Sequence, residues 1–285
     1  MADKQVLDRN GHTPWDVSTA AYDEKSKYVG DQDWSPYGVR FKPDGTKMYI
    51  MGLSNHTVYQ YSLSTPWDVS TADYDEKSKD VNAQEPYPYD VCFKPDGTKM
   101  YIMGFYNSTV YQYSLSTPWD VSTADYDKKS KDVSAQDTYS HGICFKPDGT
   151  KMYMVGDAND TIYQYSLSTP WDVSTADYDE KFKDVSAQDT YPYDVCFKPD
   201  GTKMYLVGDA NNTVYQYSLS TPWAISTADY DEKFKDVSAQ DTGPLGVCFK
   251  PDGTKMYIMG WANDRVLQYS LPPPAVGRSF GFIIG

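Results

Sequence analysis

The sequence is poor in the residues that build metal centres and disulfide bonds. Its 285 residues include three histidines and four cysteines, with no CxxC motif and no closely spaced histidine pair. The cysteines recur at a fixed interval, at Cys92, Cys144, Cys196 and Cys248, and Arg40 holds the equivalent place in the first copy. Equivalent positions of successive repeats normally lie beyond the roughly 7 Å that a disulfide spans. We therefore predict small buried thiols, and neither a metal nor a cofactor.

Long apolar runs and an excess of basic residues are also missing. No run approaches the roughly 20 residues that cross a bilayer, and the opening "MADKQVLDRN" lacks the apolar stretch of a secretory signal. The formal net charge is -14, from 40 acidic and 26 basic side chains. This charge disfavours nucleic acid and anionic membranes, so we expect no nucleic-acid partner and no membrane insertion. The sequence does not define a compartment, although it favours an extracellular or virion surface over the cytoplasm.

The sequence does contain one repeat unit, present in five near-identical copies. The stretch "FKPDGTKMYIMG" begins at Phe41, and near-copies begin 52 residues apart at Phe93, Phe145, Phe197 and Phe249. Each unit is rich in Tyr, Val, Ile and Thr and is punctuated by Pro, Gly, Asn and Asp, which is typical of strands and turns. No unit shows a convincing helical pattern.

The first unit predicts four strands, which we name A to D. Strand A is expected at 37–41 and strand B at 47–52, joined by the turn "KPDGT", in which Gly45 is free to take a positive φ. Strand B carries four successive apolar residues, so both of its faces should be buried. Strand C is expected at 57–64, and a longer connection leads to strand D at 74–81. Strand D is polar, as expected for an exposed outer edge.

Five such units predict an all-β, five-bladed β-propeller with four antiparallel strands per blade. The chain opens with a connection and a strand D, and its last unit has strands A, B and C but no D. We therefore expect a closing blade of three C-terminal strands and one N-terminal strand. The predicted blades are 36–87, 88–139, 140–191, 192–243, and 244–271 with 13–35, followed by a tail at 272–285. Residues 5–10 resemble a surplus strand C.

The repeated motif resembles a known family. "FKPDGTKMYIMG" followed by "NxTVYQYSLST" is similar to YVTN-type propeller repeats, which occur in many bacterial and archaeal surface proteins. The shared residues are those of turns and core, so the resemblance implies a fold rather than a function. The segment "TPWDVSTADYDEK" departs from that family. A five-bladed ring also resembles the tachylectins, which implies sugar binding, but that likeness rests on blade count.

The five copies disagree mainly in two loops. The B–C loop and the D–A loop vary from unit to unit, while the "KPDGT" turn is constant. In a propeller these two loops emerge on one face, around the mouth of the central channel. Variation on one rim of a rigid scaffold indicates a recognition surface. The Asn common to every B–C loop is expected to adopt the left-handed backbone of a turn.

The residues of these loops suit a sugar or a protein partner. Aromatic rings stack on sugar C–H groups, carboxylates accept hydrogen bonds from hydroxyls, and Trp and Tyr also anchor protein interfaces. The B–C candidates are Leu53, His56, Phe105, Tyr106, Asp157, Asp209 and Trp261. The D–A candidates are Trp34, Tyr89, His141 and Tyr193, with Tyr37, Tyr87, Tyr139 and Tyr191 beside them. Two alternatives need no ligand. The B–C loops could differ only through neutral substitutions at solvent-exposed positions, and the tyrosines of the D–A loops could be buried core residues.

An enzyme is not expected. Glu24, Glu76, Glu180 and Glu232 fall on the outer strands, far from the channel where paired carboxylates would act. The best catalytic candidates are Asp90 and Asp194, which replace glycines of the other units near the channel. Near-identical blades offer little of the asymmetry that catalysis needs.

We therefore predict a non-catalytic module that binds a glycan or surface polymer. The alternatives are a structural or protein-interaction component of a virion or cell-surface assembly, and a designed or recently amplified repeat without a refined ligand. In the second case the tail "PPPAVGRSFGFIIG" would dock into an assembly partner.

Overall fold

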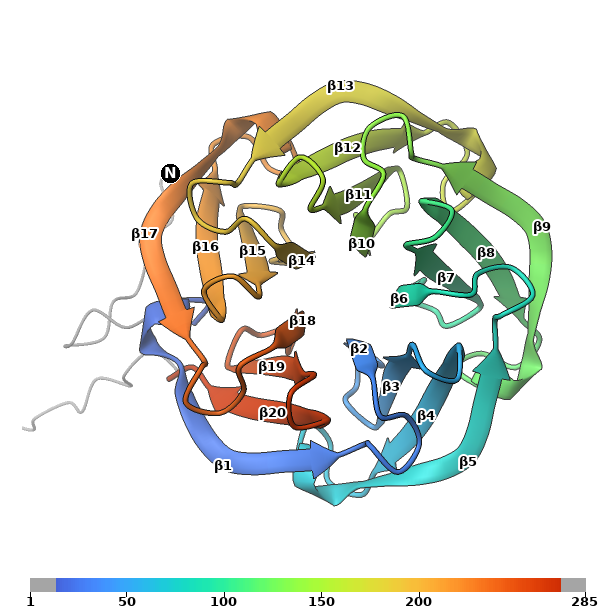
Figure 1. Ribbon diagram of the computed structural model, residues 1–285, viewed down its shortest axis with the longest axis vertical. Coiled ribbons are helices and arrows are strands. Elements are labelled where there is room, and N and C mark those ends of the chain that lie inside the picture. The colour runs from blue at the N-terminus through green and yellow to red at the C-terminus, as the bar shows by residue number, and fades with distance from the viewer. Residues whose placement is uncertain (1–13, 273–285) are drawn as a thin grey trace, which may run out of the picture.

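The computed structural model describes residues 14–272 as a ring of twenty strands (Figure 1). The strands form five antiparallel sheets of four. The chain is a five-bladed β-propeller. Both the predicted tail beyond Pro272 and the segment 5–10 lie outside the described residues.

Each blade uses the four strands in the same order from the axis outward. Strands A are β2 (Pro36–Phe41), β6 (Pro88–Phe93), β10 (Ser140–Phe145), β14 (Pro192–Phe197) and β18 (Pro244–Phe249). Strands B are β3 (Lys47–Gly52), β7 (Lys99–Gly104), β11 (Lys151–Gly156), β15 (Lys203–Gly208) and β19 (Lys255–Gly260). Strands C are β4 (Thr57–Leu63), β8 (Thr109–Leu115), β12 (Thr161–Leu167), β16 (Thr213–Leu219) and β20 (Arg265–Ser270). Strands D are β5 (Ala72–Asp80), β9 (Ala124–Asp132), β13 (Ala176–Asp184), β17 (Ala228–Asp236) and β1 (Ala21–Tyr28).

The predicted strand pattern is confirmed within a residue or two. In strand B, Met48, Tyr49, Ile50 and Met51 are all buried, because blades pack on both faces of the sheet. Gly45 has a φ of 74°, as its turn requires. The sequence did not reveal a bulge in each strand D, where Glu76 and its equivalents adopt positive φ. Nor did it reveal the single-turn 3-10 helices η1 (Val17–Thr19), η2 (Val69–Thr71), η3 (Val121–Thr123), η4 (Val173–Thr175) and η5 (Ile225–Thr227) in the connections.

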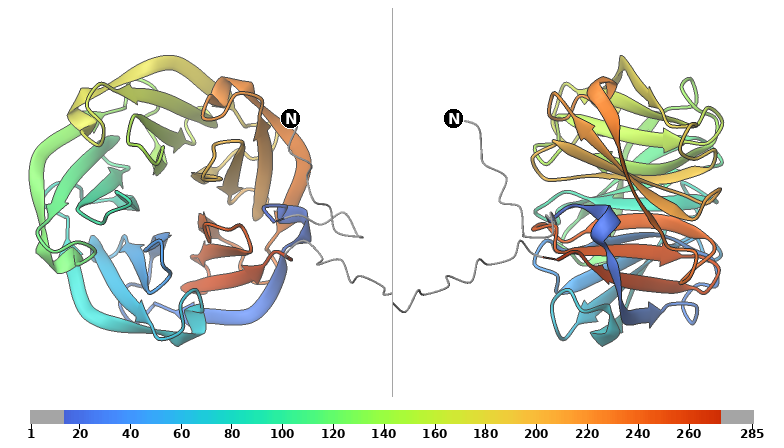
Figure 2. Two further views of the ribbon diagram at one scale, coloured as in Figure 1. Left: turned by 180° about the vertical axis from the view of Figure 1, so that it is seen from behind. Right: turned by 90° about the vertical axis from the view of Figure 1, so that its left-hand side faces the viewer.

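The closing blade combines both ends of the described chain, as predicted. Strand β1 pairs with β20, so the sheet order is β1-β20-β19-β18. Figures 1 and 2 show β1 running along the outer edge of the blade whose inner strands come from the end of the chain. Lys255 of β19 donates to Asp23 of β1 over 2.9 Å, which ties the two segments together.

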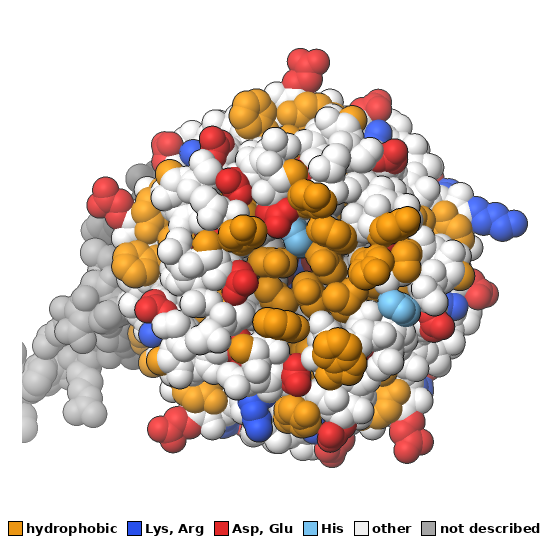
Figure 3. Space-filling view, viewed as in Figure 1, with side chains coloured by type: hydrophobic (Ala, Val, Ile, Leu, Met, Phe, Trp, Pro, Cys, Tyr) orange, Lys and Arg blue, Asp and Glu red, His pale blue; other side chains and the backbone are white. Residues whose placement is uncertain are grey.

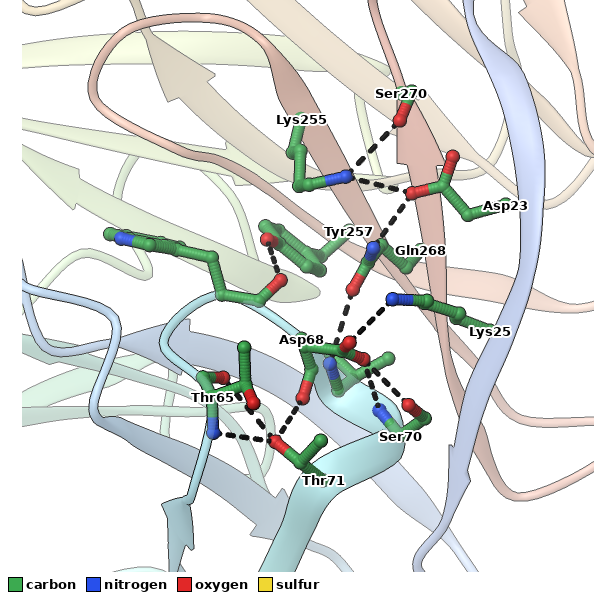
Figure 4. Close-up of polar contacts among 12 residues, drawn as sticks. Asp23, Lys25, Thr65, Asp68, Ser70, Thr71, Lys255, Tyr257, Gln268 and Ser270 are labelled. Carbon is green, nitrogen blue, oxygen red and sulfur yellow. Dashed lines mark hydrogen bonds and ion pairs between the residues drawn. The ribbon is translucent and has the colours of Figure 1, made fainter.

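A polar clip joins neighbouring blades at their outer strands (Figure 4). Lys25 on β1 pairs with Asp68, the residue that caps η2. Gln268 is fully buried between them; its Oε1 accepts a hydrogen bond from the Val69 amide at 3.1 Å. The same ion pair recurs between Lys77 and Asp120, Lys129 and Asp172, and Lys233 and Asp16.

The junction between the third and fourth blades lacks this ion pair. Ala224 stands where the other connections have Asp, η5 has no side-chain cap, and Lys181 forms no ion pair within residues 14–272. We expect Ala224→Asp to raise the free energy of unfolding by about 1 kcal/mol, since it supplies an N-cap. A matched Asp120→Ala should cost a similar amount at an intact junction. Urea denaturation measures both; no gain from Ala224→Asp would show that the clip contributes nothing to stability.

Candidate functional site

The rim face is the face that carries the D–A and B–C loops. A buried carboxylate in each D–A loop holds the neighbouring B–C loop. In the first blade, Asp33 Oδ1 accepts from the amides of Ser35 (2.9 Å) and Ser54 (3.1 Å), and Oδ2 accepts from the Asn55 amide (2.8 Å). The equivalent residues are Glu85, Asp137, Asp189 and Asp241, all buried. The two loops therefore share one face, as predicted, and the variable side chains project from a fixed backbone.

The shared Asn of the B–C loop does not have the predicted role. The positive φ belongs to the next residue, with values of 52° at His56, 49° at Asp160 and 51° at Asn212. The Asn55 side chain instead donates from Nδ2 to the carbonyl of Gln32 over 2.9 Å. The Asn is therefore a second link between the two loops in four blades, whereas Asn107 donates to the Tyr111 hydroxyl over 3.3 Å. The prediction of a left-handed Asn was wrong.

Aromatic side chains meet at the centre of the rim face. The residues at one equivalent position of the five blades are Tyr37, Tyr89, His141, Tyr193 and Leu245. Tyr89 stacks on Tyr37 with ring centroids 4.5 Å apart and on His141 at 5.0 Å. Tyr193 lies 4.4 Å from His141 and 6.4 Å from Tyr37. These contacts cross from blade to blade, so the rings close the channel mouth, and Figure 3 shows apolar side chains gathered there.

Further aromatic groups extend this cluster outward over the second and third blades. Phe105 lies 4.9 Å from Tyr89 and stacks on Tyr139 at 5.2 Å. Tyr106 is 67% exposed and packs beside Tyr87 at 5.9 Å. The rim thus presents a continuous band of rings, part buried and part open to solvent.

The other side of the rim is completed by Trp261. The fourth blade carries Tyr191 at the outer rim position, which is 55% exposed, but the fifth and first blades have Gly243 and Ser35 there. Trp261 packs over Gly243, and its Nε1 donates to Ser35 Oγ over 3.2 Å. The single tryptophan therefore covers the two blades that have no rim tyrosine.

Acidic groups lie beside these rings. Asp157 Oδ2 is 3.1 Å from Nε2 of His141. Burial, together with the nearby Asp189 and Asp241, raises the pKa of Asp209. Burial also raises the pKa of Tyr37, and the negative charge of Asp209 adds to the effect. Carboxylate acceptors thus stand next to neutral aromatic rings.

The predicted site residues are therefore only partly brought together. The central cluster contains Tyr89, His141, Tyr193, Phe105 and Asp157, with Tyr37 and Tyr139. Leu53 and His56 are half-buried in the first B–C loop. Trp34 is 71% exposed, and within residues 14–272 it makes no ring–ring contact. Asp209, Tyr106 and Trp261 belong to the surrounding rim.

The two catalytic candidates have a structural role instead. Asp90 and Asp194 are 2% exposed, and both pair with Arg40, which crosses the channel below the aromatic cluster. Arg40 bonds Asp194 through both Nη atoms, at 2.8 and 2.9 Å. Backbone amides of Ile143 and Val247 also donate to these carboxylates. Neither carboxylate is therefore an accessible acid or base, because the arginine and the amides occupy both.

Burial and the second carboxylate raise the pKa of Asp90, although Arg40 opposes the shift. Glycines at the alternate positions make room for the carboxylates. A Cβ on Gly38 would lie 2.6 Å from Asp90 Oδ1, and one on Gly142 would lie 2.9 Å from Asp194 Oδ1. The alternation of Gly and Asp around the ring thus builds one buried ionic cluster.

The four cysteines lie one step further along the channel. They are free thiols, and burial raises the pKa of each one. Cys248 is buried as predicted, whereas the other three are partly open to a cavity of about 240 Å³. The cavity is lined by the four thiols, Arg40 and the Phe, Trp and Pro residues of the opposite face. Within residues 14–272, no three His, Cys, Asp or Glu side chains are placed to hold a metal ion.

Buried polar atoms without partners are concentrated on the rim face. In the described part of the chain they belong to seven residues, Ser54, His56, Glu85, His141, Asp157, Asp160 and Asn212. All seven lie in the B–C or D–A loops or at the start of strand A. Native proteins leave few such atoms unsatisfied, and water or a ligand usually supplies the partner.

Comparison with known proteins shows the fold. No family model and no curated protein matches the chain. Candidate 6-phosphogluconolactonases from Bacteroides fragilis and Bacteroides uniformis superpose with TM-scores of 0.50 and 0.51, each at 15% identity. The matches cover 74% and 84% of this chain, and 56% and 68% of theirs. The β-propeller domain of Cps50 (Swd1) from Myceliophteria thermophila matches with a TM-score of 0.50 and 10% identity, over 89% of this chain and 100% of that domain.

At these identities the likeness supports a propeller and nothing finer. The chain spans little more than half the length of the Bacteroides fragilis protein. The YVTN-type resemblance agrees with a propeller fold, but no family match establishes membership. No helix in residues 14–272 has the length and apolar character to cross a membrane.

Proposed function

We propose that this chain is a non-catalytic recognition module that binds a neutral glycan through its rim face. One observation carries the proposal: exposed aromatic rings and unpartnered polar atoms gather on the face whose loops differ between blades. The opposite face repeats the same turn in all five blades. Rings that stack on sugar C–H patches beside carboxylates that accept from hydroxyls are the elements of a glycan site.

The charge distribution favours a neutral ligand over an acidic one. The net charge of -14 and the rim carboxylates Asp157 and Asp209 would repel an anionic polysaccharide. The rings around the channel mouth are held by mutual stacking, and the backbone of the loops is fixed by buried carboxylates. Such preorganisation lowers the entropy cost of binding.

The structural likeness to candidate 6-phosphogluconolactonases does not favour a hydrolase here. Such chemistry needs an accessible acid or base near the channel mouth. The two carboxylates nearest the axis, Asp90 and Asp194, are buried and bound to Arg40. We therefore assign the rim to binding, without a catalytic step.

A glycan array tests this proposal with the intact chain and a double variant, Phe105→Ala with Trp261→Ala. The variant removes rings on opposite sides of the rim. We expect at least about tenfold weaker binding, which corresponds to about 1.4 kcal/mol. The control is Tyr28→Asp, which removes an exposed ring of an outer strand, introduces the residue of the other blades and should leave rim binding unchanged. If neither the intact chain nor the folded rim variant binds any glycan, the rim would instead serve a protein partner.

A further inference from the structure

The outer wall of the fourth blade contains a second pocket, formed by its two outer strands and by its D–A and B–C loops. Its volume is about 340 Å³, and it lies between the D–A loop, the B–C loop and strands β16 and β17. Gln188, Asn211, Thr213, Tyr215, Tyr230 and Phe234 line it. None of these side chains carries a charge at neutral pH, which favours an uncharged ligand.

Phe234 gives the pocket an exposed aromatic surface. It stands on β17 opposite Tyr215 of β16, and 53% of its surface is accessible. A phenylalanine on an outer strand is unexpected, because the first, second and fifth blades have Ser78, Ser130 and Ser26 at this position. Lys233 and Lys235 flank Phe234 but point to the opposite side of the strand.

The pocket also offers a hydrogen-bond donor and an acceptor without partners. Tyr217 donates to Gln188 Oε1 over 2.9 Å, so the Gln188 amide nitrogen is turned away from that bond. Asn211 donates from Nδ2 to the Gln188 carbonyl over 3.0 Å, which leaves its Oδ1 as an acceptor. Within residues 14–272, neither Gln188 Nε2 nor Asn211 Oδ1 takes part in a side-chain hydrogen bond.

The third blade repeats this arrangement. Phe182 is 55% exposed and pairs across the strands with Tyr163. Gln136 accepts from Tyr165 over 2.9 Å, and Asn159 donates to the Gln136 carbonyl over 3.1 Å. In the fifth blade the equivalent place is taken by Arg265, which donates to Ser26 over 3.0 Å.

We propose that the outer walls of the third and fourth blades each bind one neutral pyranose, stacked on Phe182 or Phe234 and hydrogen-bonded by the adjacent Gln and Asn. An aromatic face beside one amide donor and one amide acceptor matches a sugar ring, which has an apolar C–H patch and vicinal hydroxyls. The volume holds one ring rather than a chain, and the lack of lining charges disfavours acidic sugars and charged peptides. These sites share the rim loops but use none of the aromatic rings around the channel mouth.

Saturation-transfer NMR with methyl glucopyranoside, methyl galactopyranoside and methyl N-acetylglucosaminide tests the proposal. A ligand this small should bind with a dissociation constant on the order of 1 mM. In a chain that already carries Phe105→Ala with Trp261→Ala, Phe182→Ser with Phe234→Ser should abolish the transfer. The fold should survive because serine is the natural residue of other blades. Glucuronate should show no transfer in any variant.

A gain-of-function variant gives the sharper test. The first blade has Gln32, Asn55, Tyr59 and Tyr74 in place and differs at two lining positions, with Asp31 for Ala187 and Ser78 for Phe234. Adding Asp31→Ala and Ser78→Phe to the double serine variant should restore binding at one site per chain.

Three results would overturn the proposal: no pyranose bound by the intact chain, equal binding by the double serine variant, or loss of binding only in Phe105→Ala with Trp261→Ala. The last would instead support the rim, so the two proposals fail separately.

Discussion

Arg40→Cys should lower the free energy of unfolding by about 3–5 kcal/mol, the cost of removing one partner from a buried ionic cluster. The other four blades have cysteine at this position, so the repeat already accommodates the new side chain. It leaves Asp90 and Asp194 facing each other across the channel, both buried, with no cation between them. Urea or thermal denaturation measures the loss.

The matched control removes the whole cluster. A triple variant, Arg40→Cys with Asp90→Gly and Asp194→Gly, gives every blade the residues that alternate blades already have. We expect it to regain most of the stability, since replacing a complete buried ionic group is often neutral. Asp90→Gly alone should cost less than Arg40→Cys, because Arg40 and Asp194 remain as a two-point pair. If Arg40→Cys is as stable as the parent chain, the cluster does not hold the channel together.

This cluster also shows which features of the structure could be predicted from the sequence and which could not. The period, the turn glycine and the incomplete terminal units predict the ring, its blade number and its closure, because each is a local pattern repeated five times. The departures from the repeat were visible too: Arg40 among cysteines, and Asp90 and Asp194 among glycines. Two acidic departures and one basic departure, at strand A positions two residues apart, could have suggested a pair across the axis. Their partners lie 50 and 154 residues away, so only the closed ring brings them together.

The candidate site could likewise be predicted from the sequence only in part. The variable loops predict the rim face, but not which of its side chains meet. Tyr89 and His141 stack because equivalent positions converge at the axis, while Trp34 lies outside that convergence. Phe182 and Phe234 replace serine in a segment that otherwise differs between the copies only at Ala21, Tyr28 and Lys128. The repeats therefore contained a signal for this second site, namely the replacement of serine by phenylalanine in two copies. It was overlooked because strand D is otherwise polar.

Deleting residues 1–35 should remove the cooperative unfolding transition. The described part of this segment supplies β1 and the buried side chains of Trp15, Val17 and Val29. Truncating one large buried side chain typically costs about 2–5 kcal/mol, and a whole domain is stable by only about 5–15 kcal/mol. The segment also seals the fourth blade, because Tyr205 donates to the Trp15 carbonyl over 2.8 Å. Circular dichroism during heating measures the loss.

A circular permutant separates the closing contacts from the position of the chain ends. In the first blade, Leu63-Ser64-Thr65-Pro66-Trp67 joins strand C to the outer connection, and Leu63 and Trp67 bond the Thr46 and Gly45 carbonyls. Leu271 and Trp15 make the same bonds to Thr254 and Gly253, with the chain broken between them. A chain of residues 36–271, one serine and residues 13–35 rebuilds the Leu-Ser-Thr-Pro-Trp link. We expect this permutant to fold with close to parental stability, since every strand of the closing blade is present. If the permutant stays unfolded while the deletion variant folds, the three-plus-one blade does not close the ring.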